Sequence, residues 1–320
     1  MSGTHRDSDR PSPSTALQLS SLCGHLIRRC ERIHTGIWLD EIGESVTSVQ
    51  YGVLAALDDR PGIDQRLLSE IVALDKSSTA DVVARLMRAR WITRRRNADD
   101  GRRYELALTP AARAAFAQLV PEVGRVQDRL LEAVADGDRG DLLRGLRLIA
   151  GGAGAVGSPR ADRRRSAPDV DYAATEVAAL DVPGHHIRRA QQAHTAIWKA
   201  EFGRELTGPQ YAVLHVLARS PHINQGTTCL LAAVDKSTGA DIVDRLVRQG
   251  RIVRHRDPDD GRGNVLSLTD DAIRLAEQAS PRVEAVQHRL LAPITVSDRD
   301  EFVRLLQRVA YAGMALDAFL

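Results

Sequence analysis

The sequence predicts a mainly α-helical chain with small β-hairpins, an α+β protein built from two copies of one domain. The first observation is an internal repeat: GHLIRRCERIHTGIW at 24–38 returns as GHHIRRAQQAHTAIW at 184–198, an offset of 160 residues. About 48 of 108 ungapped positions between the two copies are identical. The other two observations are a helical apolar period and a pair of short charged hairpins. A fixed offset over this length indicates a duplicated domain.

The repeat defines the expected domain organisation. Residues 1–15 are polar and rich in Pro and Ser, so we expect a disordered N-terminus, followed by a first domain at 16–150. Residues 151–171 contain Gly, Pro and Arg without an apolar period, which is typical of a linker. The second domain then covers 172–320, with its first helix beginning near Tyr172. At 320 residues, each domain is long enough to bury its own core.

Composition excludes several classes of protein. No run approaches the roughly 20 apolar residues needed to cross a bilayer, and the N-terminus has no apolar signal segment, so we expect a cytoplasmic protein without membrane contact. The three cysteines have no CxxC or repeated spacing, and no Cys or Glu accompanies the histidines at ligand spacing. We therefore expect no disulfide, metal or cofactor. We also find no nucleophile with a placed base, so we expect no enzyme.

Apolar spacing and capping signals predict the helices. Leu19, Leu22, Leu26, Cys30, Ile33 and Ile37 recur at three- and four-residue steps, as on one face of a long helix that needs an apolar partner. Thr47 and Thr207 each precede a Gln by three residues, which is a capping box that opens a second helix. A short helix at 65–73 follows. Asp75 and Asp235 are expected N-caps of fourth helices at 76–90 and 236–250.

The period then changes to that of strands. Residues 91–96 and 104–108 are short strand-like runs, and Asp100-Gly101 between them supplies the turn of a hairpin. Thr109-Pro110 opens a fifth helix, and Asp138 is expected to cap a sixth. This order is that of a winged helix-turn-helix domain between long helices. Two such domains in one chain predict a monomer that acts as a pseudo-dimer, with a higher oligomer as the alternative.

These motifs resemble those of the MarR family of bacterial transcriptional regulators, over about 20–150 and 178–318. The wing pattern DxRxxxxxLT of that family occurs twice, at Asp100, Arg102, Leu108 and Thr109 and again 160 residues later. DKSS and DKST at the start of the fourth helices are similar as well. The resemblance implies intertwined dimers that bind an operator in double-stranded DNA, and often release it when a small aromatic or phenolic ligand binds. It implies a repressor here.

The expected DNA contacts lie on the fourth helices and the hairpins. Residues 85–103 contain eight arginines and two aspartates, and small hydroxyls at a helix start suit entry into the major groove. The set is Lys76, Ser77, Ser78, Thr79, Arg94, Arg95, Arg96, Arg102, Arg103, Lys236, Ser237, Thr238, Arg254, Arg256 and Arg262.

Two further features of the fourth helices and hairpins affect the expected DNA binding. Asp81 and Asp241 either accept from cytosine or pair with the arginine four residues on. Fewer arginines at 245–263, and Gly239 in place of Thr79, predict that the first repeat contributes more affinity.

Repeated aromatic residues suggest where a ligand could bind. His34 and Trp38 are four residues apart, as are His194 and Trp198, and Tyr51 and Tyr211 recur on the second helix. These residues either line an aromatic pocket or form a core with satisfied histidines. Cys23 near the start of the first helix offers a redox switch as an alternative. A protein-interaction module that has lost its operator is the second alternative.

Overall fold

The computed structural model describes residues 18–97, 104–156, 177–257 and 263–313. The expected disordered N-terminus, the turn at Asp100-Gly101 and most of the expected linker lie outside these residues. Within them, the chain is mainly helical with two small sheets, and the predicted fold class is confirmed. The helices of the described residues include none that is long and apolar enough to span a membrane.

Each repeat has the same order of elements. The first repeat contains α1 (Cys23–Glu41), α2 (Ser48–Asp59), α3 (Gln65–Ile71), α4 (Lys76–Arg88), β1 (Ile92–Arg96), β2 (Tyr104–Leu108), α5 (Pro110–Leu130) and α6 (Asp136–Val156). The second contains α7 (Pro183–Phe202), α8 (Gly208–Arg219), β3 (Ile223–Asn224), α9 (Gln225–Leu231), α10 (Lys236–Arg248), β4 (Ile252–Arg256), β5 (Asn264–Leu268), α11 (Asp270–Leu291) and α12 (Arg299–Ala310). Short 3₁₀ turns are η1 (Leu19–Ser21), η3 (Ala178–Leu180) and η4 (Val296–Asp298).

Most of the capping signals act as the sequence predicted. Thr47 and Thr207 form complete capping boxes with the Gln three residues on. Asp75 and Asp235 cap α4 and α10, and Thr109 caps α5. These caps satisfy amides that a helix start leaves without a partner. The fourth helices, α4 and α10, which are the expected recognition helices for DNA, therefore begin at fixed residues in both repeats.

Several helix boundaries differ from the predicted ones. The helix of the first repeat begins at Cys23, so Leu19 lies outside it in η1. The corresponding helix of the second repeat begins at Pro183, not near Tyr172, because a proline has no amide to leave unsatisfied at the first position. α6 begins at Asp136, so Asp138 lies in its first turn and is not its cap. α6 also continues to Val156, into the segment expected to be linker.

The wings are antiparallel hairpins in equivalent register. Arg94 pairs with Leu106 in β1 and β2, and Arg254 pairs with Leu266 in β4 and β5. The second repeat adds the short strand β3 to the other side of β5. Alternation along β2 buries Leu106 and Leu108 against the winged domain and leaves Tyr104 exposed.

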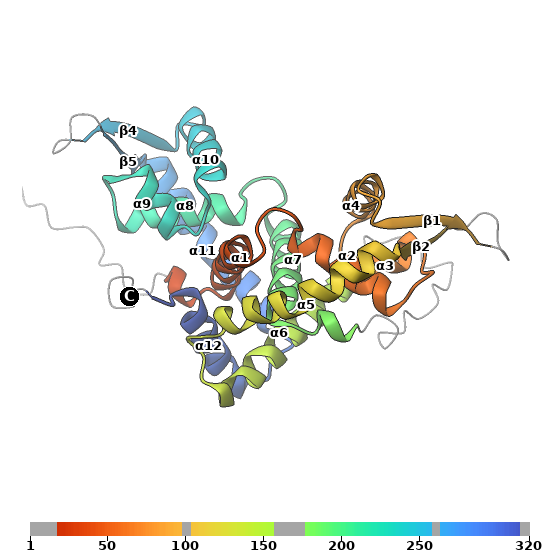
Figure 1. The fold of residues 1–320 in the computed structure, drawn as a ribbon. Coiled ribbons are helices and arrows are strands. Elements are labelled where there is room, and N and C mark those ends of the chain that lie inside the picture. The colour runs from red at the N-terminus through yellow and green to blue at the C-terminus, as the bar shows by residue number, and fades with distance from the viewer. Residues whose placement is uncertain (1–17, 98–103, 157–176, 258–262, 314–320) are drawn as a thin grey trace, which may run out of the picture.

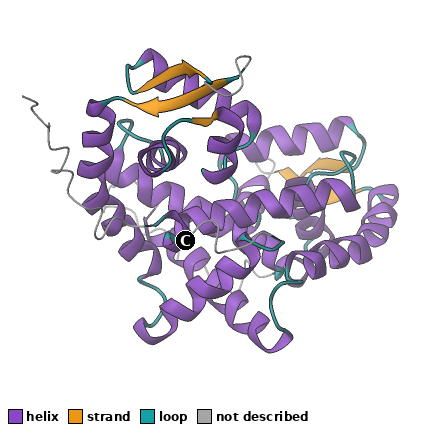
Figure 2. Ribbon diagram, turned by 90° about the vertical axis from the view of Figure 1, so that its left-hand side faces the viewer, coloured by secondary structure: helices purple, strands orange, loops and turns teal. Residues whose placement is uncertain are grey.

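The two winged domains flank a shared helical base (Figures 1 and 2). In Figure 1 the first, with β1 and β2, lies at the right and the second, with β4 and β5, at the upper left. The base joins α1, α5 and α6 of the first repeat to α7, α11 and α12 of the second, and α1 packs on both α7 and α12. One apolar core contains Leu26 of α1 together with Ile187 and Leu306. The two repeats thus form a pseudo-dimer within one chain.

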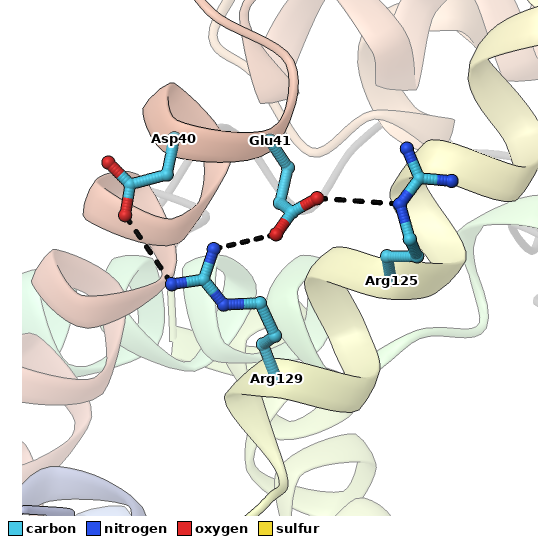
Figure 3. Close-up of polar contacts among 4 residues, drawn as sticks. All are labelled: Asp40, Glu41, Arg125 and Arg129. Carbon is cyan, nitrogen blue, oxygen red and sulfur yellow. Dashed lines mark hydrogen bonds and ion pairs between the residues drawn. The ribbon is translucent and has the colours of Figure 1, made fainter.

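Ion pairs join two helices of the base within each repeat, α1 to α5 in the first and α7 to α11 in the second. Glu41 at the end of α1 accepts from Arg129 of α5 at 2.6 Å and from Arg125 at 3.4 Å, and Asp40 accepts from Arg129 at 3.4 Å (Figure 3). These contacts hold the pKa of Glu41 below its usual range, chiefly through Arg129. In the second repeat Glu201 lies 3.5 Å from Arg282 and 3.6 Å from Arg289.

Candidate functional site

The starts of α4 and α10 are exposed and pre-organised. Asp75 accepts from the amides of Ser77 and Ser78 at 2.9 Å, and both hydroxyls donate to the same carboxylate at 2.6 Å. These hydrogen bonds hold the pKa of Asp75 well below its usual range. Lys76 beside this cap is exposed. Equivalent contacts join Asp235 to Ser237 and Thr238 next to exposed Lys236. This part of the expected DNA-binding set therefore lies on one accessible helix end in each repeat.

Thr79 is not part of that surface, so its predicted role was wrong. Its side chain is fully buried, and its hydroxyl donates to the Asp75 carbonyl at 2.9 Å. At the equivalent position, a Cβ on Gly239 would lie 2.3 Å from the Cys229 sulfur. The first repeat has the smaller Ser69 where the second has Cys229. The difference at 79 and 239 is thus a packing exchange behind the recognition helix.

Asp81 and Asp241 are exposed on the recognition helices. Among the ion pairs of the described residues, neither carboxylate joins the arginine four residues on. The predicted ion pair is therefore not formed here. Both carboxylates remain able to accept hydrogen bonds from outside the chain.

The wing arginines have different surroundings in the two repeats. Arg94, Arg95 and Arg96 are exposed on β1, as Arg254 and Arg256 are on β4. The Arg94 guanidinium lies 3.8 Å from the centre of the Tyr104 ring. Arg254 instead forms an ion pair with Asp244 of α10. Arg102, Arg103 and Arg262 lie outside the described residues.

The predicted ligand residues come together in two cavities, each walled by both repeats. In the first, the Trp38 cavity, His34, Trp38 and Tyr51 face Gly184, His185 and Arg188 of the second repeat. In the second, the Trp198 cavity, His194, Trp198 and Tyr211 face Gly24, His25 and Arg28 of the first. Each holds about 20 Å³ of free space, so an aromatic ligand requires the walls to move apart.

The aromatic residues also hold the fold together. The Trp38 and Trp198 indoles donate to the carbonyls of Val46 and Leu206 at 2.7 and 2.6 Å. Ring centres of Trp38 and Tyr51 are 5.8 Å apart, as are those of Trp198 and Tyr211. The rings are therefore both core and cavity wall. The expectation of satisfied histidines was wrong, because His34 Nε2 and His194 Nδ1 are buried without a hydrogen-bond partner among the described residues.

Each cavity histidine packs on a glycine of the other repeat. A Cβ on Gly184 would lie 2.2 Å from His34 Nε2, and one on Gly24 would lie 2.2 Å from His194 Nε2. Burial, followed by the charge of Arg188, lowers the pKa of His34 to about 4. Burial, followed by Arg28, lowers the pKa of His194 to about 3. These imidazoles are therefore neutral at physiological pH.

Sequence reasoning missed the cavity arginines Arg28 and Arg188. Each donates across the repeat boundary, Arg188 to the Val72 carbonyl at 2.8 Å and Arg28 to the Ala232 carbonyl at 3.2 Å. Burial lowers the pKa of both to about 10. Their occurrence at the same place in both copies was the available signal. Without this repetition, an arginine on a helix would be expected to lie on the protein surface.

The starts of α1 and α7 are each capped by the opposite repeat. The N-cap residues Leu22 and Val182 give no side-chain hydrogen bond. Instead Gln287 of α11 accepts from the Cys23 amide at 2.9 Å, and Gln127 of α5 accepts from the Gly184 amide at 2.9 Å. Each repeat therefore supplies the hydrogen-bond acceptor for the first turn of the other repeat's first helix.

The Cys23 thiol lies in the apolar core and is fully buried. Burial, followed by the neighbouring Cys30, raises its pKa. A redox-sensing cysteine needs a thiolate that solvent can reach. The Cys23 thiol is buried, and its raised pKa keeps it protonated. The geometry therefore argues against the redox alternative.

Comparison with known proteins identifies the family. The model for the MarR family matches residues 45–103 and 205–263, once in each repeat. Transcriptional regulator HosA of Escherichia coli O111:H- is 30% identical over 128 residues, which is 40% of this chain and 94% of HosA. The HTH-type transcriptional repressor NicR of Pseudomonas putida is 27% identical over 127 residues, 39% of this chain and 80% of NicR. The crystal structure of PcaV from Streptomyces coelicolor with its natural ligand aligns with a TM-score of 0.39 and 40% identity, over 41% of this chain and 92% of that one. This chain belongs to the MarR family of DNA-binding transcriptional regulators and carries the family's domain twice.

Proposed function

We propose that this chain is a repressor that binds one double-stranded operator as a monomeric pseudo-dimer and releases it when a small aromatic carboxylate binds. α4 and α10 each enter a major groove, and the basic wings contact the backbone. A bound regulator that covers a promoter blocks transcription, and NicR, which resembles this chain, is named a repressor. The ligand sites are the Trp38 and Trp198 cavities.

The proposal rests on the two cavity arginines, because each lines a cavity and also donates a hydrogen bond to a helix-turn-helix. Arg188 lines the Trp38 cavity and donates to Val72 at the end of α3, directly before the turn into α4. Arg28 does the same between the Trp198 cavity and Ala232 at the end of α9. A group in the Trp38 cavity that attracts Arg188 therefore acts on the helix-turn-helix of the first repeat, and a group in the Trp198 cavity that attracts Arg28 acts on that of the second.

The turns held by these arginines are strained. Ala73 and Ala233 follow the two accepting carbonyls with φ of 49° and 53°, a conformation that side chains with a Cβ rarely adopt. The hydrogen bond from the arginine supports the carbonyl just before each strained residue. When this bond is lost, the turn gains freedom to relax and the recognition helix moves with it.

The cavity chemistry favours an aromatic carboxylate. Within the described residues, Arg188 Nη1, Arg28 Nε and His34 Nε2 are buried without a hydrogen-bond partner. Buried polar atoms are costly to leave unpaired, and a carboxylate accepts well from the two arginines in a planar geometry. The indole and phenol rings supply the apolar contact area for a ligand ring.

The test measures release of DNA. A labelled duplex from a selection of bound genomic fragments is followed by fluorescence anisotropy, and 4-hydroxybenzoate and benzoate are titrated against benzamide as an uncharged control. We expect one chain per duplex, an affinity that falls steeply with salt, and release by the carboxylates alone. Failure to bind any duplex at low salt, or equal release by benzamide, contradicts the proposal.

Matched variants test the arginines. The double substitution Arg28→Gln with Arg188→Gln is expected to weaken DNA binding without ligand, because both turns lose a donor, and to abolish the response to benzoate. Arg32→Gln, an exposed position on the same helix α1, is the control and should leave both properties unchanged. Release of the double variant at the wild-type benzoate concentration would contradict the assignment.

A further inference from the structure

We infer that Asp244 clamps the wing arginine Arg254 to its own recognition helix, so that the second winged domain holds its DNA half-site more weakly than the first. The inference rests on the proposed DNA binding. It predicts that, on a duplex with two half-sites, the half-site bound by α4 contributes more to the affinity than the half-site bound by α10.

The clamp joins two elements that would both face DNA. Asp244 lies on α10 and Arg254 lies on β4, and the two side chains form an ion pair with about half of the Asp244 side chain exposed. The same guanidinium also contacts Gln225 at the start of α9 at 3.5 Å. Arg254 is thus held over the helix surface, and its guanidinium already has a carboxylate partner.

The first repeat has no such clamp. Ala84 occupies the position of Asp244, and Tyr104 occupies the position of Asn264. Arg94 stacks on the Tyr104 ring, and among the ion pairs of the described residues none involves Arg94. A ring orients a guanidinium without cancelling its charge, so Arg94 remains available to a phosphate.

The recognition helix α10 also carries one more negative charge than α4, which should further weaken DNA binding by the second winged domain. α10 carries Asp241 and Asp244 on its exposed face, whereas α4 carries Asp81 alone. Phosphate must displace Asp244 from Arg254 and must also approach the added carboxylate. Breaking an exposed ion pair alone lowers affinity by about two- to fivefold, and repulsion of phosphate adds to this.

The experiment uses the full chain and a duplex with two identical half-sites. Asp244→Ala should tighten binding by about five- to tenfold and make the salt dependence steeper by about one phosphate contact. The reciprocal change Ala84→Asp, at an exposed helix position, should weaken binding by a similar factor. Asp271→Ala removes an exposed carboxylate from α11 and is the charge-matched control, expected to change affinity less than about twofold.

A second duplex locates the effect. With one half-site scrambled, the first winged domain takes the intact half, so Asp244→Ala should change affinity less than about twofold there. Arg94→Ala should cost more than Arg254→Ala in the wild-type background, and the two losses should become equal in Asp244→Ala. Circular dichroism confirms that each variant is folded.

The outcomes separate the two proposals. An Asp244→Ala affinity equal to that of Asp271→Ala, or equal losses from the two arginine substitutions in the wild-type background, overturns the clamp while DNA binding stands. Absence of DNA binding by the wild-type chain overturns the proposed function and the clamp with it.

Discussion

Substituting Gly184 by alanine should destabilise the chain through a contact between the two repeats. The new Cβ would lie 2.2 Å from Nε2 and 2.5 Å from Cδ2 of His34, an imidazole that is 6% exposed and surrounded by packed residues. A methyl group forced into such a site typically costs about 1–3 kcal/mol. Gly36→Ala on α1 is the control, because a Cβ there meets nothing within 4 Å and a helical Gly→Ala change gains about 0.5–1 kcal/mol. Urea unfolding at constant m value should therefore separate the two variants by about 1.5–4 kcal/mol.

A double-mutant cycle gives the decisive result. His34→Ala removes the ring that the Gly184→Ala methyl group meets, so the double variant should show a favourable coupling of about 1–3 kcal/mol between the two positions. The urea midpoint should not depend on protein concentration, because both partners belong to one chain. Additive effects, a Gly184→Ala variant as stable as Gly36→Ala, or a midpoint that rises with concentration would each refute the reasoning.

Three further predictions concern the capping glutamines, pH and the thiols. Gln127→Ala and Gln287→Ala should each lower the free energy of unfolding by about 1 kcal/mol by uncapping a helix of the other repeat, whereas exposed Gln118→Ala on α5 should not, as measured in urea. Because burial lowers the pKa of His34, His194 and His215 to about 4, 3 and 4, the unfolded chain binds protons below about pH 6.5 that the folded chain rejects. The contribution of these histidines to stability should therefore be full above that pH and fall from about pH 6.5 to 3, and His194→Asn should make the pH dependence of unfolding less steep than in the wild type. A His194→Asn variant with the same pH dependence as the wild type contradicts the assignment of a neutral His194. Cys23 and Cys30 should react with a thiol reagent only after urea unfolding, and peroxide should not release DNA; a fast reaction of Cys23 in the folded chain would restore the redox alternative.

Local chemistry made much of the fold predictable. Thr47, Asp75 and Thr109 act within three residues of themselves, so their caps can be read from the chain directly. The constant offset of 160 residues then predicted the corresponding elements of the second repeat. Asp138 failed as a cap because an acidic residue is equally favourable within the first turn of a helix, where it meets the positive end of the dipole.

The candidate site was predicted less completely because its walls come from both repeats. His34, Trp38 and Tyr51 could be grouped by spacing, but their neighbour Arg188 is distant in sequence and belongs to the other copy. Thr79 failed for a related reason: a helix start exposes some positions and buries others, and only the packing against α3 decides between them. Pairs such as Gly239 and Cys229 show that this packing has been exchanged in the second repeat.

The reciprocal caps of α1 and α7 also limit when these two helices can be completed during synthesis. The core of the first winged domain draws almost entirely on residues from Trp38 to Val126, so it can form as soon as that stretch is made. The start of α1 must wait, since the Gln287 that caps it is synthesised 264 residues after Cys23. Until then Leu26 and Ile27 lack most of their apolar neighbours and are exposed to other nascent chains. Joining the repeats limits this interval, because the missing partner arrives on the same chain at a high effective concentration and not by a chance encounter.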